Sequence, residues 1–385
     1  MRKIGTAVVG TGFIGPVHVE ALRRLGQPVV GLLGSSRSRS QAAADALGIA
    51  KAYGDFAELL ADSDVGAVHL ASPNRLHAEQ ALAAIAAGKH VLCEKPLAMS
   101  TDESQQLVEA AQDAESRGIV TAINTNIRYY PLCLELRQRV RAGEFGSITQ
   151  IVGSYLQDWL LEDTDFNWRV LQSEGGPLRA VADIGTHWID LVCFITDLEV
   201  EEVCADLATV YPTRYAPRGS GSVETFTGGT VDRNSREPIS VDTEDLGSVL
   251  IRFVGGARAC LSVSQMMAGR KNCLRFDLAG TRASAAWNSE EPNQLQIGYR
   301  NQANALLFRD PSLLHDSVRP FANYPGGHAE GFPDSHKQLF RAFYERIATG
   351  KPGAIPLPSF ADGHRVMRIC DAILASSRNH AWVRV

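Results

Sequence analysis

Residues 4–15 read IGTAVVGTGFIG, an apolar run that leads into a pattern of three glycines, Gly10, Gly12 and Gly15. Residues 4–9 have the continuous apolar character of a buried strand, and residues 16–25 carry apolar side chains at helical spacing. The glycines therefore lie at a strand-to-helix turn. At such a turn the first glycine permits the bend, the second lets backbone amides approach a pyrophosphate, and the third lets the helix pack closely on the sheet. An ordinary glycine turn is the alternative, but the flanking strand and helix favour a dinucleotide site.

The first 125 residues alternate short apolar runs with helical patterns. Beyond the first strand, strands are expected at residues 29–33, 67–70, 90–93 and 120–123, and helices at 40–47, 55–60, 77–87 and 102–117. This alternation implies a parallel sheet covered by helices on both faces. The fold class is therefore α/β, with an N-terminal doubly wound Rossmann domain over residues 1–127.

The pattern changes after residue 128, and a second domain over residues 128–385 is expected. A helix at 131–142 precedes period-two stretches at 148–159, 246–253, 257–264 and 272–278, which predict a mostly antiparallel sheet. Helices at 181–195, 333–348 and 361–376 are expected to cover one face of that sheet. The stretch 214–238 has few apolar residues and is typical of a mobile loop.

The composition argues against several classes of protein. The 385 residues are 45% hydrophobic with a net charge of only −5, and no basic patch indicates nucleic acid or an anionic membrane as a partner. No apolar stretch reaches the roughly 20 residues of a membrane span, and no signal region precedes the first strand, so a cytoplasmic protein is expected. The seven cysteines are scattered without a C-x-x-C pair, so free thiols and no structural zinc site are expected.

The preferred dinucleotide depends on the end of the second strand, where a carboxylate would bind the ribose hydroxyls of NAD. No carboxylate occurs there: the segment contains Ser35, Ser36, Arg37 and Arg39. Hydroxyls and guanidiniums suit a 2′-phosphate, so the sequence leans weakly towards NADP. Alternatively, the arginines only begin the next helix, and a neutral turn accepts NAD.

Further polar residues follow the strands at the ligand-binding edge. Ser72, Pro73, Asn74 and His77 follow the strand at 67–70, although Asn74 also suits a helix cap and His77 a first helical turn. Glu94, Lys95 and Pro96 follow the strand at 90–93, where the proline disfavours helical geometry at the lysine and helps to hold its backbone extended. A strand-end lysine is usually just solvated, but the glycine motif favours a functional role here.

Asp183 and His187 are four residues apart at the start of a predicted helix, so their side chains share one face. A histidine there can take a hydroxyl proton, Lys95 can hydrogen-bond the same oxygen, and Asp183 can orient the pair. A helix cap and a buried histidine form the structural alternative. A shared metal ion lacks an obvious third ligand, so none is predicted.

The order of G-x-G-x-x-G, Glu94-Lys95-Pro96 and Asp183-Ile184-Gly185-Thr186-His187 resembles the Gfo/Idh/MocA family, the glucose-fructose oxidoreductase and inositol dehydrogenase group, over essentially the whole chain. The resemblance implies a large open sheet in a second domain that binds substrate and forms oligomers, either a homodimer or a homotetramer. It also implies NAD(P) as hydride carrier, sugars or polyols as substrates, and a catalytic set of Lys95, Asp183 and His187.

The expected contacts combine the residue patterns with this resemblance, which alone supplies Trp168 and Arg169 near the nicotinamide. Tyr155, Gln157 and Trp159 alternate on one strand face, as suits a carbohydrate but also a plain sheet core. The cofactor contacts are predicted to be Gly10, Gly12, Phe13, Ile14, Gly15, Ser35, Ser36, Arg37, Arg39, Ser72, Pro73, Asn74, His77, Glu94, Lys95, Asn124, Trp168 and Arg169. The substrate contacts are predicted to be Lys95, Arg128, Tyr155, Gln157, Trp159, Asp183, His187, Asn272 and His328.

The function predicted from these residues is hydride transfer between NAD(P) and a secondary alcohol or ketone carbon of a cyclic sugar, glycoside or polyol. Two other functions stay open: a glycoside-cleaving enzyme that uses transient oxidation, and a noncatalytic NAD(P)-sensing relative.

Overall fold

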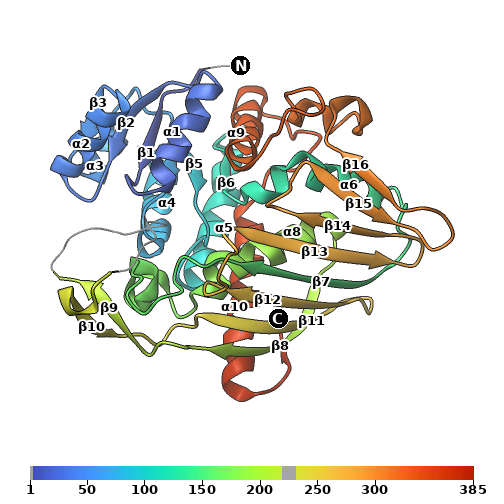
Figure 1. Cartoon of the computed structure of the whole chain (residues 1–385). Helices are drawn as coiled ribbons and strands as arrows, with labels where there is room; N and C mark the ends of the chain where they lie inside the picture. Colours follow the sequence, from blue (N-terminus) through green and yellow to red (C-terminus); the bar gives the residue numbers. More distant parts are fainter. Residues whose placement is uncertain (1–2, 219–230) are drawn as a thin grey trace. The chain divides into compact units, whose positions relative to one another are not determined.

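A computed structural model describes residues 3–218 and 231–385 (Figure 1). The chain forms two compact units. The first comprises Met1–Tyr129 and Gly331–Met367, and the second comprises Tyr130–Glu330 and Arg368–Val385. The boundary expected after residue 127 therefore lies close to the first crossing between the units, whereas the return of residues 331–367 to the first unit was not expected.

The first unit is built on a six-stranded parallel sheet with the order β3-β2-β1-β4-β5-β6. The α/β doubly wound fold class is thus confirmed, and β1 and β4 are the neighbours at which the strand order reverses, where such sheets bind ligands. The short third strand was not predicted. The strands are β1 (Thr6–Val9), β2 (Val29–Leu33), β3 (Lys51–Tyr53), β4 (Ala67–Leu70), β5 (His90–Cys93) and β6 (Thr121–Ile123).

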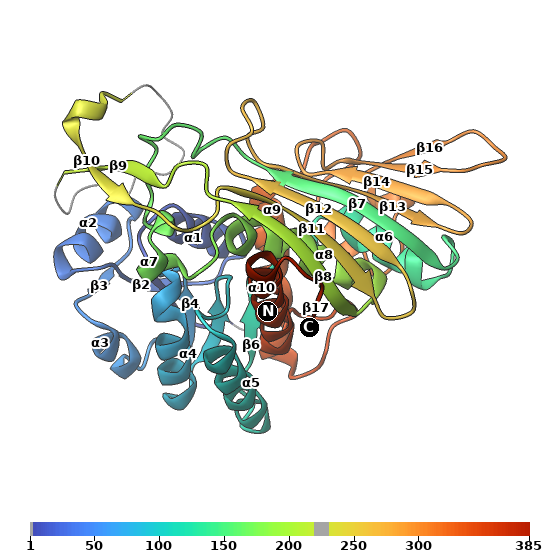
Figure 2. The ribbon, with the colours of Figure 1, turned by 90° about the horizontal axis from the view of Figure 1, so that it is seen from below.

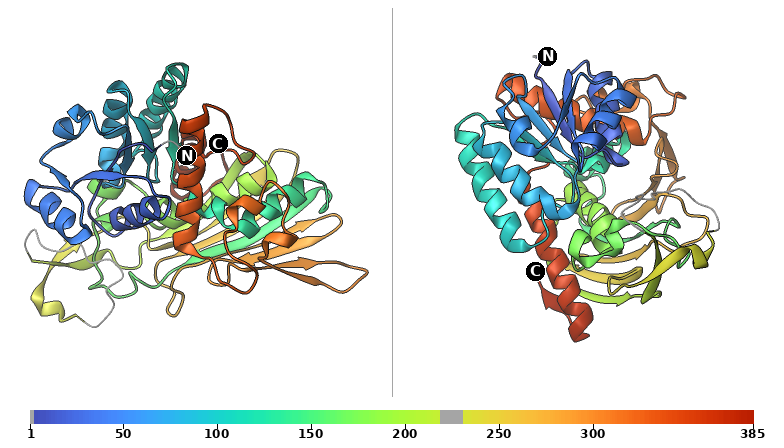
Figure 3. Two further views of the ribbon diagram at one scale, coloured as in Figure 1. Left: turned by 90° about the horizontal axis from the view of Figure 1, so that it is seen from above. Right: turned by 90° about the vertical axis from the view of Figure 1, so that its left-hand side faces the viewer.

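Helices cover both faces of this sheet, and most begin at a side chain that caps them (Figure 3). Ser36 accepts a hydrogen bond from the Arg39 amide, so α2 begins three residues before the predicted start. Asp55 and Ser100 cap the helices that begin at Phe56 and Thr101 in the same way. The bounds are α1 (Ile14–Arg24), α2 (Arg37–Leu47), α3 (Phe56–Ala61), α4 (His77–Ala86) and α5 (Thr101–Ser116).

Helix α9 (Phe332–Thr349) belongs to the first unit, which corrects the expectation that it covers the second sheet. Asn126 donates a hydrogen bond of 2.7 Å to the Ser335 hydroxyl, and the Tyr344 hydroxyl lies 3.0 Å from Nε2 of His69 on β4. An amphipathic pattern shows that a helix has a buried face but not which sheet buries it. Here long-range hydrogen bonds join α9 to the first unit.

The second unit contains a nine-stranded sheet with the order β16-β15-β14-β13-β7-β12-β11-β8-β17 (Figure 2). Its strand pairs are antiparallel except β7 with β12, which confirms the expected large, mostly antiparallel sheet. The strands are β7 (Ile148–Leu156), β8 (Val200–Ala208), β11 (Leu246–Phe253), β12 (Arg258–Ser264), β13 (Cys273–Gly280), β14 (Ser284–Asn288), β15 (Gln294–Gly298), β16 (Ala305–Phe308) and β17 (Val383–Arg384).

Helices α6 (Pro131–Arg141) and α8 (Thr186–Thr196) belong to the second unit, and α10 (Phe360–Asn379) has residues in both units. The remaining short helices are η1 (Asn74–Leu76), η2 (Asn126–Tyr129), η3 (Trp168–Val170), α7 (Gln172–Gly175), η4 (Val181–Gly185), η5 (Arg233–Ser235), η6 (Pro311–Leu313) and η7 (Arg319–Phe321). No helix in the described part of the chain is both long enough and apolar enough to cross a membrane.

The prediction of a mobile loop at 214–238 is wrong at both of its ends, while residues 219–230 lie outside the described residues. Strands β9 (Thr213–Pro217) and β10 (Arg236–Ser240) pair as an antiparallel ribbon. Arg214 is fully buried and donates hydrogen bonds of 2.9 Å to the carbonyl oxygens of Leu160 and Glu162. A polar composition concealed this order because the stabilising partners are distant backbone groups.

Candidate active site

The glycine turn in the first unit has the geometry that a pyrophosphate site requires. Gly10 has φ of +109°, and a Cβ there would lie 2.1 Å from the carbonyl oxygen of Ala71. By contrast, a Cβ on Gly12 would meet nothing within 4 Å, so the turn has open space beside it. Because α1 begins two residues later, its first amides follow this open turn. These residues fit a dinucleotide.

The segment after β2 is exposed, and its arginine already has a partner. Nη2 of Arg37 lies 2.6 Å from Oε2 of Glu58, which also accepts a hydrogen bond of 2.8 Å from the Gly54 amide. Ser35, Ser36 and Arg39 are exposed beside it. Sequence reasoning missed Glu58 because that residue lies one strand and one helix further along the chain.

The loops after β4 and β5 are tied together by His77. Its ring is buried, with Nδ1 2.7 Å from the carbonyl oxygen of Pro96 and Nε2 2.9 Å from that of Ser72. Burial lowers the pKa of His77 despite these carbonyl contacts. His77 therefore joins two loops at the ligand-binding edge. Asn74 is buried in the same loop.

Lys95 is partly buried directly after β5, and its peptide bond to Pro96 is cis. The preceding Glu94 turns into the interior, where it is bonded to His18 and Asn124. Burial alone would raise the pKa of Glu94, but the hydrogen bond and charge of His18 outweigh it and lower the pKa to about 2. The residue directly before the lysine is thus held by two buried partners.

Arg128, a predicted substrate contact, is also buried in the first unit. Its guanidinium lies 3.5 Å from the carboxylate of Asp362 on α10. Burial would raise the pKa of Asp362, but the charges of Arg128 and Arg365 lower it well below its usual range. This arrangement gives Arg128 an intramolecular partner in the structure.

In the second unit, Asp183 lies in the π-helical turn η4 and His187 in the first turn of α8. Nε of Arg169 lies 3.1 Å from Oδ1 of Asp183, and the amide of Gln265 donates a hydrogen bond of 2.9 Å to Oδ2. Both carboxylate oxygens are therefore held from different segments. π-Helical turns are frequent at functional sites.

The start of this helical segment is fixed by Glu244, which sequence reasoning missed. The buried Glu244 carboxylate accepts hydrogen bonds from the amides of Arg179 and Val181, at 2.9 and 2.8 Å. Burial raises the pKa of Glu244. No local sequence signal marks this cap, because its acceptor lies 63 residues after Val181.

Four of the predicted substrate contacts form one hydrogen-bonded group beside His187. The rings of Tyr155 and His187 have centroids 6.1 Å apart. The Tyr155 hydroxyl and the Gln157 amide each donate to Oδ1 of Asn272 at 2.7 Å, and Nε1 of Trp159 donates to Oε1 of Gln157 at 2.8 Å. Burial raises the pKa of Tyr155 well above its usual range, so its hydroxyl keeps the proton that it donates.

Helix α8 is anchored next to His187 by Trp188, which is fully buried. Its Nε1 donates a hydrogen bond of 3.0 Å to the carbonyl oxygen of Arg275 on β13. Gly153 on β7 makes this approach possible, because a Cβ there would lie 2.3 Å from Nε1 of Trp188. The position of His187 along the sheet is thus set by its buried neighbour.

Trp168 and Arg169, which were predicted near the nicotinamide, and His328, which was predicted near the substrate, have different surroundings. The Arg169 guanidinium lies 4.4 Å from the centroid of the Trp168 ring, so these two residues form a cation–π pair. His328 is exposed in a loop, where its Nδ1 lies 3.3 Å from the carbonyl oxygen of Gly326. The His328 ring thus contacts its own loop, whereas Arg169 contacts Asp183.

Comparison with known proteins agrees with this geometry. Residues 4–122 match a family model described as an oxidoreductase family with an NAD-binding Rossmann fold, and residues 133–286 match the GFO/IDH/MocA C-terminal domain. A levoglucosan dehydrogenase of Pseudarthrobacter phenanthrenivorans is 32% identical over 400 residues, covering 100% of this chain and 99% of that protein. This chain belongs to the Gfo/Idh/MocA family. It is accordingly an oxidoreductase with an NAD-binding Rossmann domain.

Other sugar oxidoreductases are similar to all or to part of this chain. A solved structure of levoglucosan dehydrogenase in complex with NADH and L-sorbose has a TM-score of 0.88 at 29% identity, covering 100% of this chain and 99% of that one. A 1,5-anhydro-D-fructose reductase of Ensifer adhaerens is 35% identical over 49% of this chain and 54% of that protein. The predicted family membership is confirmed.

Proposed function

We propose that the protein is an NAD(P)-dependent dehydrogenase that oxidises a secondary alcohol of a cyclic sugar, glycoside or polyol to a ketone, or catalyses the reverse reduction. The observation that carries this proposal is the group around His187. A histidine, two aromatic rings and the amides of Gln157 and Asn272 lie together in the second unit. Aromatic surface with a few placed hydrogen-bonding groups suits a sugar ring, and sugar-converting relatives are similar in sequence.

Each member of the predicted catalytic set has a distinct task in this proposal. A bound NAD(P) supplies the hydride acceptor. His187 takes the proton of the substrate hydroxyl, and the Lys95 ammonium donates a hydrogen bond to the same oxygen as its negative charge develops. Asp183, held by Arg169 and Gln265, orients the histidine and balances its charge once protonated.

The cofactor's phosphate state is part of the same proposal. Exposed hydroxyls and guanidiniums after β2 favour a 2′-phosphate, while the ion pair of Arg37 with Glu58 opposes it by engaging one guanidinium. We therefore propose that the protein accepts both NAD and NADP. Assembly as a homodimer or homotetramer is proposed on family resemblance, and light scattering coupled to size exclusion tests it.

A screen of cofactor reduction tests the function. NAD and NADP are each offered with glucose, glucosides, inositols and anhydrosugars, and formation of the reduced nicotinamide is followed by its absorbance. Steady turnover with at least one cyclic polyol or sugar is expected, and the Lys95→Ala variant should lose it. Release of free sugar from a glycoside without net cofactor reduction would identify glycoside cleavage instead. Tight cofactor binding without turnover of any compound would point to a sensor.

A further inference from the structure

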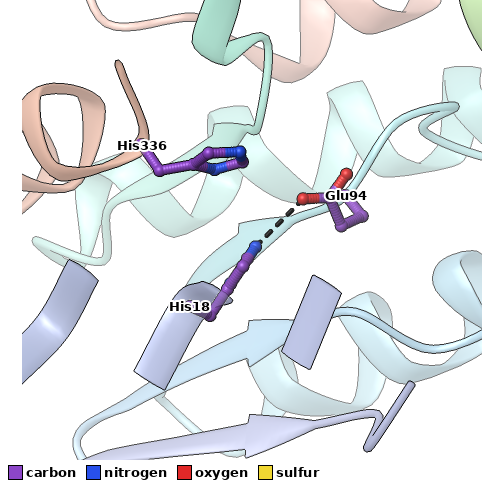
Figure 4. A group of neighbouring side chains, drawn as sticks. All are labelled: His18, Glu94 and His336. Atoms are coloured by element: carbon purple, nitrogen blue, oxygen red, sulfur yellow. Dashed lines mark hydrogen bonds and ion pairs between the residues drawn. The ribbon is translucent and has the colours of Figure 1, made fainter. Parts of the chain in front are cut away.

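A buried chain of polar side chains runs through the first unit and ends at Glu94, the residue before Lys95. It links five residues from five segments: Glu94 after β5, His18 on α1, His69 on β4, Tyr344 on α9 and Thr6 on β1. Glu94 is 8% exposed and the other four are fully buried. Figure 4 shows the first bond, from His18 to Glu94, with His336 beside it.

The distances make the chain continuous. Oε1 of Glu94 lies 3.0 Å from Nε2 of His18, and the Nδ1 atoms of His18 and His69 are 3.1 Å apart. Nε2 of His69 lies 3.0 Å from the Tyr344 hydroxyl, which lies 2.6 Å from the Thr6 hydroxyl. Thr6 then donates to the carbonyl oxygen of Ile4 at 3.2 Å.

The chain has more hydrogen bonds than its neutral groups have protons. The two ends, a carboxylate and a carbonyl oxygen, only accept hydrogen bonds, so all five bonds need a proton from the groups between them. Two neutral imidazoles and two hydroxyls supply four protons. For all five bonds to form together one further proton is needed, and it makes one of the two imidazoles an imidazolium or resides in the bond to Glu94. With neutral groups alone, one of the five contacts carries no proton.

The neighbouring groups indicate which residue holds the additional proton. Burial and the charge of His18 lower the pKa of His69 well below its usual value. Burial lowers the pKa of His336 to about 3, so that ring is neutral as well. The Glu94 carboxylate, in contrast, is directly bonded to His18. Among the described residues, three titratable groups contact His18 through a hydrogen bond or a ring contact: Glu94, His69 and His336. Glu94 is the anion among them.

We propose that His18 is held as an imidazolium by this chain and that it acts as a positioning residue for Lys95. The buried pair of His18 and Glu94 is then neutral overall, and the carboxylate stays in place. Its Oε2 lies 3.3 Å from the backbone nitrogen of Lys95, which donates to it. The extra proton thereby supports the backbone that carries the lysine. The charge state of His18 stands independently of the proposed function, whereas its effect on turnover depends on it.

A metal ion is the competing explanation for this cluster. Nitrogen atoms of His18 and His336 and an oxygen of Glu94 all lie within 4.8 Å of one another, a donor set that transition metals accept. However, Nδ2 of Asn124 bonds Glu94 and lies 3.3 Å from Nε2 of His18 and 3.1 Å from Nδ1 of His336. A hydrogen-bond donor between the three atoms disfavours a cation at that place.

Thr6→Val tests the proposal without altering His18. The valine has nearly the same shape but removes the last two bonds, and the three bonds that remain need only three protons, which neutral groups supply. Nitrogen-15 NMR of histidine-labelled protein at neutral pH should show both nitrogens of His18 protonated in the wild type and one in Thr6→Val. Ser104→Ala is the matched control, because it removes a buried hydroxyl bonded to another histidine, His364, at 2.9 Å. His18 should be unchanged in it.

The stability of the protein gives a second readout. If the folded chain holds an extra proton, it binds more protons than the unfolded chain above the unfolded histidine pKa of roughly 6.5. The unfolding midpoint of the wild type should therefore fall more steeply from neutral to mildly alkaline pH than that of Thr6→Val. Ser104→Ala should follow the wild type.

Two results would overturn the proposal. One is a His18 with a single protonated nitrogen in the wild type, together with equal pH dependence in all three proteins. The other is tight binding of Zn²⁺ by the dialysed wild-type protein that is lost in His336→Gln, which would assign the cluster to a metal. Turnover is a separate measurement: Thr6→Val should lower kcat several-fold with cofactor affinity unchanged, and absence of any turnover would leave the NMR result intact.

Discussion

Arg169 and Asp183 form an ion pair in the second unit, with Nε of the arginine 3.1 Å from Oδ1 of the aspartate. The other carboxylate oxygen accepts the Gln265 amide. The aspartate is thereby fixed four residues before His187, the residue that it orients in the proposed mechanism.

Asp183→Asn keeps the size of the side chain but loses its charge and the ion pair. We expect kcat to fall by about 10²-fold or more, since positioned acid–base groups contribute on that order. Steady-state kinetics with the best substrate of the screen measures it. Asp206→Asn, at an exposed position on β8, is the control and should retain full kcat. Equal rates in both variants would remove Asp183 from the mechanism.

Lys95→Ala and His187→Ala should each lower kcat by orders of magnitude while the cofactor dissociation constant stays within about twofold. If both residues act on one substrate oxygen, the double variant should lose little beyond the worse single variant. Lys351→Ala, at an exposed position, serves as the control. Fully additive losses would show that the two side chains act in separate steps.

The ion pair of Arg37 with Glu58 predicts a change in cofactor preference. Glu58→Gln should free the guanidinium and raise kcat/KM for NADP relative to NAD by about fivefold, as fits an exposed pair worth roughly 1 kcal/mol. Arg37→Ala should lower the same ratio by about tenfold. In the double variant the effect of Glu58→Gln should vanish. A persisting effect would mean that Glu58 acts without the arginine.

The lowered pKa of Glu94, about 2 in the folded protein, predicts a dependence of stability on acid. Because the unfolded carboxyl titrates near 4.5, the stabilisation from the ionised group is present above that pH and is lost as the pH falls towards 2. Thermal unfolding of the wild type and Glu94→Gln should therefore differ most near neutral pH and converge in acid. A constant difference across this range would contradict the lowered pKa.

Glu244→Ala should destabilise the protein by about 1–3 kcal/mol, because the amides of Arg179 and Val181 lose a buried acceptor. Since these amides begin the segment that carries Asp183, kcat should fall as well. Calorimetry and kinetics measure both effects. Glu237→Ala, at an exposed carboxylate, should change neither. A stable variant with low kcat would assign the residue to chemistry rather than to folding.

The sequence predicted the parallel sheet well, because its strands are local and nearly all apolar. Strands β2, β4 and β5 have the expected bounds, whereas the three-residue β3 is too short to give a pattern. Helix α2 shows a different failure: its start is set by the Ser36 cap, which lies before the apolar spacing begins. Periodicity reports the buried face of an element, and caps set its ends.

How well the surroundings of a site residue could be predicted depends on whether its hydrogen-bond partners are near in sequence. Tyr155, Gln157 and Trp159 share a strand face because of their spacing, and the structure brings Asn272 to them. Arg128 and His77 have the same polar character, yet burial gives them internal partners. Glu58, Glu244 and His18 carried no local signal, since each meets its partner from another element.

The sequence by itself determined the glycine turn, the alternation of strands and helices, and the residue types that link this chain to its family. These features depend on neighbours within a few residues, where backbone geometry and side-chain spacing suffice. Only the tertiary structure decided that α9 joins the first unit, that residues 213–217 and 236–240 form paired strands, and which carboxylate holds each buried cation. The physical reason is that hydrogen bonds and ion pairs join groups far apart in the chain, and a polar residue does not record locally which partner it will meet.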